Sequence, residues 1–200
     1  MTLALALRRG FPWSRVGPYV IAQMLGAFAG AAIVYVTYHE AFAAFDGGVR
    51  QIAGAQGTAG IFSTYPAPFL STFGGFIDQV VGTALLIVAV FALTDERNAP
   101  PAAGLTPVLV GVAVMGIGMA FGFNAGYAIN PARDLGPRLF TALAGWGPGV
   151  FTAANGYWWV PVVAPCVGAV IGGVGYDVCV RDRHPAQTNR IADPVQRVEQ

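Results

Sequence analysis

The chain has 200 residues and a composition typical of membrane proteins. Hydrophobic residues make up 55% of it, charged residues only 10%, and the mean hydropathy is +0.57. These values lie outside the range of ordinary soluble domains. The net charge is +1 and lysine is absent, so no basic patch indicates a nucleic-acid partner. We expect no metal, no cofactor and no enzymatic activity, because the sequence offers no cluster of nucleophiles, bases or metal ligands.

Four apolar stretches are long enough to cross the roughly 30 Å of hydrocarbon in a bilayer, which takes about 20 helical residues. In chain order, we predict transmembrane helices at 16–38, 76–94, 105–122 and 157–180. The first is too long for the apolar region of a signal peptide. It carries Gly26 and Gly30 one turn apart, and we expect them to form a generic helix-packing face. The predicted fold class is an all-α membrane protein.

Arginines flank these four helices and predict the orientation of the chain. Those before the first helix and after the last are Arg8, Arg9, Arg15, Arg181, Arg183, Arg190 and Arg197. With four crossings, the excess of positive charge on cytoplasmic segments places both termini in the cytoplasm. The short loop at 95–97 is net negative, but acidic residues contribute little to this rule. Residues 181–200 are polar and aperiodic, which predicts a cytoplasmic tail.

The segment Gly126–Arg138 contains two prolines and three charged residues between long apolar stretches. Asn130 followed by Pro131 is typical of a helix start, because Asn is a favoured N-cap and proline is tolerated at the first helical position. Irregular backbone leading into a short helix is tolerated at membrane depth only where it is buried in protein or lines a water-filled path. We therefore predict a re-entrant pore loop and half-helix at 123–141.

Two side chains of this segment have the chemistry of pore residues. As an N-cap, Asn130 uses its side-chain oxygen on the helix amides and leaves two N–H donors free for a passing oxygen. Arg133 would present several donors near the external mouth and repel cations. The structural alternatives are a cap without solute contact for Asn130 and an ion pair with Asp134 for Arg133. Adjacent helical residues do not face each other, which disfavours the ion pair.

Asn130-Pro131-Ala132-Arg133-Asp134 closely resembles the second signature of the major intrinsic protein (aquaporin) family. With aspartate at position 134, the motif is most similar to that of the aquaglyceroporin branch, the glycerol facilitators. The likeness extends to about Val180 and includes other stretches at the expected spacing: Phe62-Ser63-Thr64-Tyr65-Pro66, Leu93-Thr94-Asp95, Ala144-Gly145-Trp146-Gly147 and Trp158-Trp159-Val160-Pro161. So many ordered matches make coincidence an unsatisfactory explanation.

The resemblance implies how the pore is lined. Carbonyls of Gly126, Tyr127 and Ala128 are expected to form a ladder of acceptors, and Gly118 and Tyr127 are expected to complete the constriction around Arg133. A glycine with an aromatic partner implies an opening wide enough for a small polyol. Further glycerol-type positions are Tyr38, Asp134, Arg138, Pro161 and Val162. Gln79 takes the place of a buried glutamate and is expected to pair with loop backbone, while Trp146, Trp158 and Trp159 are expected to be interfacial anchors.

Family members contain two inverted repeats, each with three spanning helices and one half-helix. This chain matches one repeat and part of the other: residues 1–14 resemble the end of the first half-helix and its loop, and 1–180 would form one channel domain. Met1 stands where relatives have valine, so we expect the natural protein to be longer. The first two helices, the first Asn-Pro-Ala and the fourth constriction residue are absent from these 200 residues.

The predicted function is passive conduction of glycerol and other small neutral solutes, including water, by a homotetramer in the plasma or inner membrane. The alternative is a non-conducting fragment or pseudogene product of such a channel. An unrelated secondary transporter would need carboxylates in the middle of its spans. Asp78 and Asp177 are instead expected at helix ends.

Overall fold

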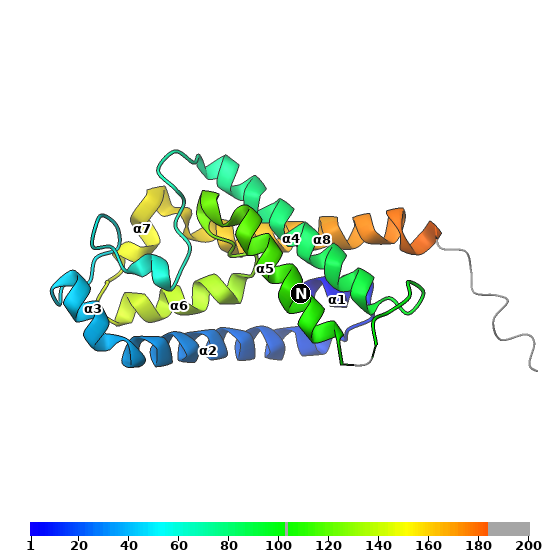
Figure 1. The fold of residues 1–200 in the computed structure, drawn as a ribbon, viewed down its shortest axis with the longest axis horizontal. Helices are drawn as coiled ribbons and strands as arrows, with labels where there is room; N and C mark the ends of the chain where they lie inside the picture. The colour runs from blue at the N-terminus through cyan, green and yellow to red at the C-terminus, as the bar shows by residue number, and fades with distance from the viewer. Residues whose placement is uncertain (103, 184–200) are drawn as a thin grey trace, which may run out of the picture.

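The computed structural model describes residues 1–102 and 104–183, and this part of the chain is helical (Figure 1). Its α-helices are α1 (Thr2–Arg8), α2 (Trp13–Thr37), α3 (His39–Asp46), α4 (Thr72–Thr94), α5 (Thr106–Ala125), α6 (Pro131–Leu143), α7 (Gly149–Gly156) and α8 (Val160–Cys179). Three short 3₁₀ turns complete it: η1 (Ala59–Ile61), η2 (Tyr157–Trp159) and η3 (Arg181–Arg183). Of the predicted tail, residues 184–200, with Arg190 and Arg197, lie outside the described residues.

Four of the helices are long and apolar enough to cross a membrane, which confirms the predicted fold class. Some boundaries differ from those predicted. Helix α4 begins four residues before 76 because the Ser71 hydroxyl accepts a hydrogen bond from the Gly74 amide, 3.0 Å away, and caps the helix at Thr72. Asp78 is therefore buried in the second turn of α4 and does not lie at its end, contrary to our expectation.

Helices α4 and α8 pack together at close range. A Cβ atom on Gly168 would collide with the Val80 carbonyl oxygen, and one on Gly172 would collide with the Ala84 carbonyl oxygen. These two glycines lie four residues apart and let the backbones approach, which is how many membrane helices associate. By contrast, a Cβ atom on Gly26 or Gly30 would meet nothing within 4 Å. Within the described chain, no helix packs against this face of α2, so the predicted packing face stays a prediction.

The two short helices α1 and α6 bring their N-termini to one small cavity of about 110 Å³. Its lining includes Met1 and Thr2 from one side and Asn130 and Pro131 from the other. Helix α6 lies along α2 and also contacts α8, while α1 packs between α8 and the start of α2 (Figure 1). The positive ends of two helix dipoles therefore face a common space.

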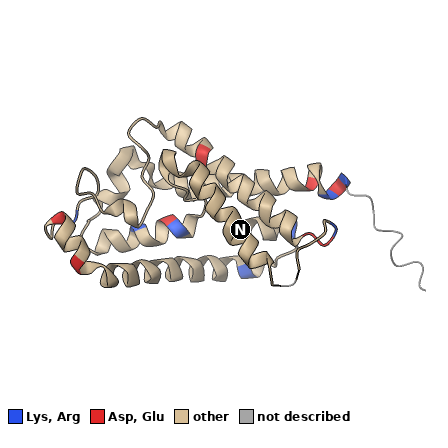
Figure 2. Cartoon of the chain, in the orientation of Figure 1, with Lys and Arg blue, Asp and Glu red and all other residues tan. Residues whose placement is uncertain are grey.

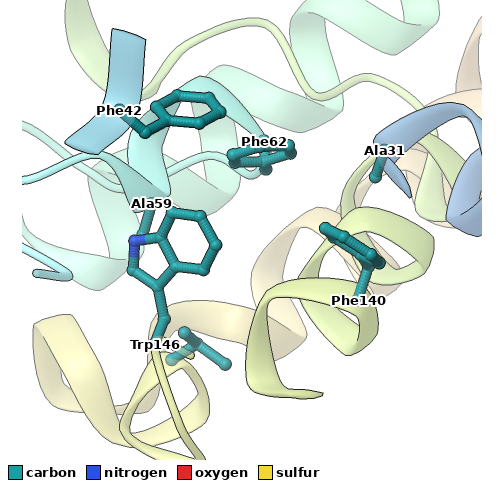
Figure 3. Packing of buried hydrophobic residues seen from close by; sticks show 7 residues of the cluster. Ala31, Phe42, Ala59, Phe62, Phe140 and Trp146 are labelled. Carbon is teal, nitrogen blue, oxygen red and sulfur yellow. The ribbon is translucent and has the colours of Figure 1, made fainter. Parts of the chain in front are cut away.

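An aromatic cluster closes the end of the molecule where α2, α3 and α6 meet the loop before α4. It contains Ala31, Phe42, Ala59, Phe62, Phe140, Trp146 and Val150 (Figure 3). Trp146 is only 5% exposed, and its indole N–H donates to the Thr58 hydroxyl at 3.1 Å. The expectation that Trp146 is an interfacial anchor is therefore wrong, because the loop folds over its ring and satisfies its donor.

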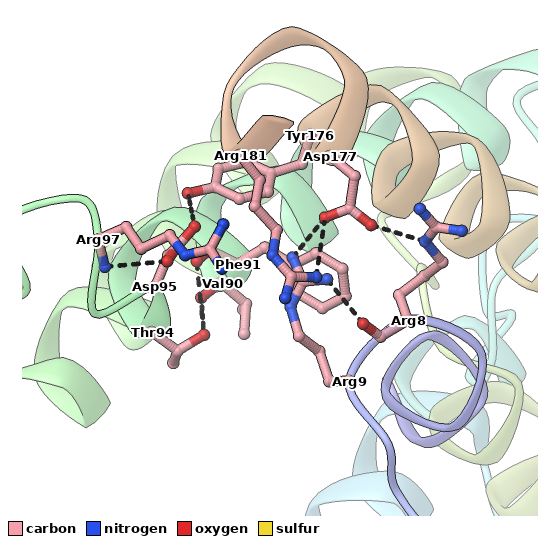
Figure 4. Close-up of polar contacts among 10 residues, drawn as sticks. All are labelled: Arg8, Arg9, Val90, Phe91, Thr94, Asp95, Arg97, Tyr176, Asp177 and Arg181. Carbon is pink, nitrogen blue, oxygen red and sulfur yellow. Dashed lines mark hydrogen bonds and ion pairs between the residues drawn. The ribbon is translucent and has the colours of Figure 1, made fainter. Parts of the chain in front are cut away.

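Arginines gather at the opposite end, around the buried carboxylate of Asp177 (Figures 2 and 4). Arg8 and Arg9 donate to it at 2.6 and 2.8 Å, and Arg181 lies 3.9 Å away. The Arg9 guanidinium also lies 3.7 Å from the centre of the Phe91 ring. This arrangement fixes α1 to the end of α8 and joins the charged segments before α2 and after α8.

Candidate functional site: a re-entrant helix with a capping asparagine

Helix α6 begins at the asparagine that the sequence predicted. The side-chain oxygen of Asn130 accepts a hydrogen bond from the Ala132 amide at 3.0 Å, and Pro131 occupies the first helical position. An amide group has two N–H donors besides this acceptor, and the exposed Asn130 side chain borders two cavities. The start of α6 therefore combines the positive end of a helix dipole with donors that point into open space.

Arg133 lies one turn further along α6 and lines a groove of about 550 Å³. The groove runs between α2 and α6, with Gln23, Ala31, Asn130 and Pro137 among its lining residues. The Nη1 atom of Arg133 is buried and has no hydrogen-bond partner within the described residues. An unpaired guanidinium N–H is costly, so Arg133 carries donor capacity that the described residues do not use.

Asp134 takes no part in an ion pair with Arg133. It points to the other side of α6, where its Oδ1 accepts from Arg138 at 3.0 Å, and both side chains are almost completely buried. Its Oδ2 accepts from the amide and the hydroxyl of Thr64. Arg138 also donates to the carbonyls of Thr64 and Val150 at 2.7 and 2.8 Å. The competing explanation, an ion pair between Arg133 and Asp134, is therefore wrong. Arg133 lines the groove instead.

Gln79 on α4 holds the extended backbone that precedes α6. Its Nε2 donates to the Gly126 carbonyl at 2.8 Å, and its Oε1 accepts from the Ile129 amide at 2.9 Å. The Gly126 carbonyl thus already has a protein donor, although a carbonyl has a second lone pair. Of the three carbonyls predicted to form an acceptor ladder, the Gly126 carbonyl is therefore partly engaged within the protein.

Gly118 and Tyr127 are in direct contact. A Cβ atom on Gly118 would lie 2.9 Å from the Tyr127 ring, so the ring lies flat on the glycine of α5. Tyr127 remains 39% exposed. Neither residue lines the groove that contains Arg133. The structure brings Gly118 and Tyr127 together, whereas Arg133, the third predicted constriction residue, lines a groove that neither of them borders.

The remaining predicted positions lie at the end of α2 and at the start of α8. Tyr38 ends α2 and borders an apolar pocket of about 440 Å³ with residues of α3 and η1. Pro161 and Val162 lie in the first turn of α8, where proline needs no intrahelical donor. Pro161 is buried, and the Val162 carbonyl accepts a hydrogen bond from the Cys166 thiol. None of these three residues lines the cavities that Asn130 and Arg133 border.

Three residues that hold the site were not singled out by the sequence. The loop before α4 holds α6 through Asp134. The Ser63 hydroxyl donates to the Asp134 carbonyl at 3.2 Å, and the Thr64 amide donates to the Asp134 carboxylate. Asn124, at the end of α5, donates to Asp78 at 2.9 Å. The sequence offered a signal for the first two, because both lie in the stretch Phe62–Pro66 that carried the resemblance. It offered none for Asn124.

Comparison with known proteins identifies the family of this chain. Residues 1–176 match the profile described as Major intrinsic protein. The chain is 50% identical to Aquaporin-10 of Homo sapiens over 184 residues, which cover 92% of this chain and 61% of that protein. It is 46% identical to Aquaglyceroporin-2 of Rhizophagus irregularis over 177 residues, which cover 88% and 56%.

A solved structure has the same fold. The X-ray structure of the aquaglyceroporin from Plasmodium falciparum matches with a TM-score of 0.78 and 32% sequence identity, covering 88% of this chain and 69% of that chain. The chain spans about three fifths of the length of the curated relatives it matches. Its four apolar helices, together with its match to that X-ray structure, indicate an integral membrane protein with an aquaporin-like fold. The chain therefore belongs to the major intrinsic protein family.

Proposed function

We propose that the protein is a passive channel for glycerol and other small neutral solutes, including water. The observation that carries the proposal is the pair formed by Asn130 and Arg133 on α6. Both line one groove, and each offers N–H donors without a protein acceptor among the described residues. Donors fixed along a path bind hydroxyl oxygens, and the positive helix end together with a guanidinium repels cations. Conduction of this kind involves no catalytic step.

The opposite walls of the groove differ in a way that suits a polyol. Asn130 and Arg133 supply polar groups from α6, whereas Ala27, Ala31 and Val34 supply an apolar surface from α2. Glycerol presents hydroxyls along one edge and C–H groups along the other. Two of the similar proteins carry the name aquaglyceroporin, which supports glycerol as the solute class.

We also propose a homotetramer in the plasma or inner membrane, with one pore in each subunit and both ends of the chain in the cytoplasm. The orientation is supported by charge. Arg8, Arg9 and Arg181 converge at one end of the helices, the end expected to face the cytoplasm (Figure 4). The tetramer and the membrane are inferred from the family alone.

The proposal is tested with the protein purified from its native membrane and reconstituted into lipid vesicles. Stopped-flow light scattering after a glycerol gradient should show faster swelling than in protein-free vesicles, while a sucrose gradient and a proton gradient should not be dissipated. Intact-mass measurement of the same sample establishes the length of the protein that conducts. Vesicles whose glycerol permeability equals that of protein-free vesicles would favour the non-conducting alternative.

Arg133→Ala provides the matched variant for selectivity. Among the described residues, Arg133 forms no ion pair, so its removal should leave the fold intact. We expect larger neutral solutes and cations to pass more readily, because the fixed charge and the bulk at the groove are lost. An unchanged order of solute permeabilities together with unchanged ion exclusion would contradict the role given to Arg133.

A further inference from the structure

A buried carboxylate stands behind the backbone that leads into α6. Asp78, in the second turn of α4, is only 7% exposed. Its Oδ2 accepts from Gln79 Nε2 at 3.1 Å, and its Oδ1 accepts from Asn124 Nδ2 at 2.9 Å. No basic side chain pairs with it in the described part of the chain. A buried charge held by two neutral amides is expensive, so a specific role must offset its cost.

The carboxylate reinforces the way the Gln79 amide faces. An ionised carboxylate can only accept hydrogen bonds, whereas the two ends of an amide differ, one donating and one accepting. Asp78 therefore stabilises the same orientation that the loop backbone requires, in which Nε2 faces Asp78 and the Gly126 carbonyl. In the same orientation, Oε1 faces the Ile129 amide. The opposite orientation would set oxygen against oxygen at Gly126 and N–H against N–H at Ile129.

The backbone that Gln79 holds is strained. Ile129 has φ of 40°, a left-handed conformation that is a real outlier for a β-branched residue. Such a conformation persists only where the surroundings impose it. Ile129 directly precedes the capping Asn130, so a relaxation at Ile129 would turn the donors of Asn130 away from their cavities.

Asn124 connects the same carboxylate to two further segments. Its side chain donates to Asp78, and its backbone carbonyl accepts from the Ala67 amide at 2.8 Å. Asp78 thereby joins the end of α5 and the loop before α4 to the strained backbone at 126–129. The hydrogen bonds around the Asp78 carboxylate thus connect three elements that surround the start of α6.

We propose that Asp78 is a positioning residue for the solute path. It acts through Gln79: by holding that amide in the orientation that the loop backbone requires, it stabilises the strained conformation at Ile129 and the direction of the Asn130 donors. The proposal rests on the proposed function as a solute channel. The hydrogen-bond arrangement can be tested by itself, which keeps the two separable.

The test compares Asp78→Ala with a swap that moves the carboxylate, Asp78→Asn/Asn124→Asp. In the swap, the new amide at 78 can accept from Gln79 and donate to the new carboxylate at 124, so the orientation of Gln79 is kept. Thr94→Val is the control: it removes a hydroxyl that bonds within α4, to the Val90 carbonyl at 2.8 Å, at the end of the helix away from the loop. If Asp78→Ala does not accumulate, Asp78→Ser is measured in its place.

The first readout is hydrogen exchange of the amides at 126–130 in the full chain in lipid nanodiscs. Loss of a hydrogen-bond network to a charged group should accelerate this exchange about tenfold in Asp78→Ala. The swap and Thr94→Val should exchange like the native protein. The second readout is glycerol permeability in vesicles, which should be lost in Asp78→Ala and restored in the swap.

Two results would overturn the proposal. Unchanged exchange at 126–130 in Asp78→Ala would show that Asp78 does not hold the backbone. Faster exchange with native glycerol permeability would show that the held backbone does not serve the path. If the native protein itself conducts no glycerol, the channel function fails, and the exchange measurement alone decides whether Asp78 stabilises the conformation at Ile129.

Discussion

Helices α4 and α8 and helices α2 and α5 are all apolar enough to cross a membrane, but their surroundings differ. In their most apolar stretches, 44% of the residues are buried in the spans that contain α4 and α8, whereas 6% are buried in α2 and 11% in α5. The first pair is joined along its length by Gly168 and Gly172. Helix α2 instead lies along α6 and meets the aromatic cluster at one end.

The difference teaches that hydropathy identifies a spanning helix without identifying its neighbours. Gly26 and Gly30 on α2 have the same four-residue spacing as Gly168 and Gly172 on α8. The α8 glycines contact carbonyls of α4, and the α2 glycines contact nothing within 4 Å of an added Cβ atom. A small residue promotes packing only where a partner backbone approaches it.

The largest effect should come from the buried ion pair of Asp134 and Arg138 within α6. The two side chains also bond to Thr64 and Val150, which connects α6 to neighbouring segments. Asp134→Asn leaves Arg138 buried without its partner, which should cost about 3–5 kcal/mol in the free energy of unfolding. The measurement is thermal unfolding in detergent. The double variant Asp134→Leu/Arg138→Met should lose much less, because it buries no unpaired charge. A single variant as stable as the native protein would contradict the assigned role of the pair.

The aromatic cluster is the second attachment of α2, and Phe62 lies in its middle, 5% exposed (Figure 3). Phe62→Ala should destabilise the protein by about 3 kcal/mol through lost contacts and a cavity. Met119→Ala on α5 is the control, since this side chain is 81% exposed and its loss should have little effect. Equal losses of melting temperature in the two variants would show that the cluster contributes no special stability.

The comparison of glycines is sharpened by placing the same side chain on the two helices. Gly172→Val forces a collision with the Ala84 carbonyl and should cost about 1–3 kcal/mol. Gly26→Val meets no atom within 4 Å and should leave the unfolding temperature in detergent nearly unchanged. The distinction between the helix pairs fails if both valines destabilise equally.

The smallest effect concerns pH at the C-terminal end of α4. Partial burial opposes the charge of Asp95, but hydrogen bonds from the Arg97 amide and the Tyr176 hydroxyl prevail and hold the pKa of Asp95 below its ordinary value. A depressed pKa in the folded state contributes stability above the ordinary pKa of about 4, which is lost as the pH falls through the folded value. Melting temperatures between pH 5 and pH 3 should therefore fall slightly less in Asp95→Asn than in the native protein. An identical or steeper fall in the variant would contradict this assignment.

Much of the fold follows from the sequence, because long apolar stretches and the pair Asn130-Pro131 are local signals. The position of Gln79 opposite loop backbone also followed from the resemblance. The burial of Trp146 did not, since its indole donates to Thr58, which is distant in the sequence. The short helices α3 and α7 and the early start of α4 were also not predicted, although the Ser71 cap of α4 is a local signal. Asp78 illustrates the limit: one of its two hydrogen-bond donors is Asn124, 46 residues further along the chain.

The most direct test of the account is the glycerol permeability of vesicles that contain the purified native protein, measured beside Arg133→Ala. The account predicts rapid glycerol entry with exclusion of protons and sucrose in the native protein, and weaker discrimination in the variant. Glycerol entry at the rate of protein-free vesicles, or identical discrimination in the two proteins, would contradict the claim that α6 lines a selective path for neutral solutes.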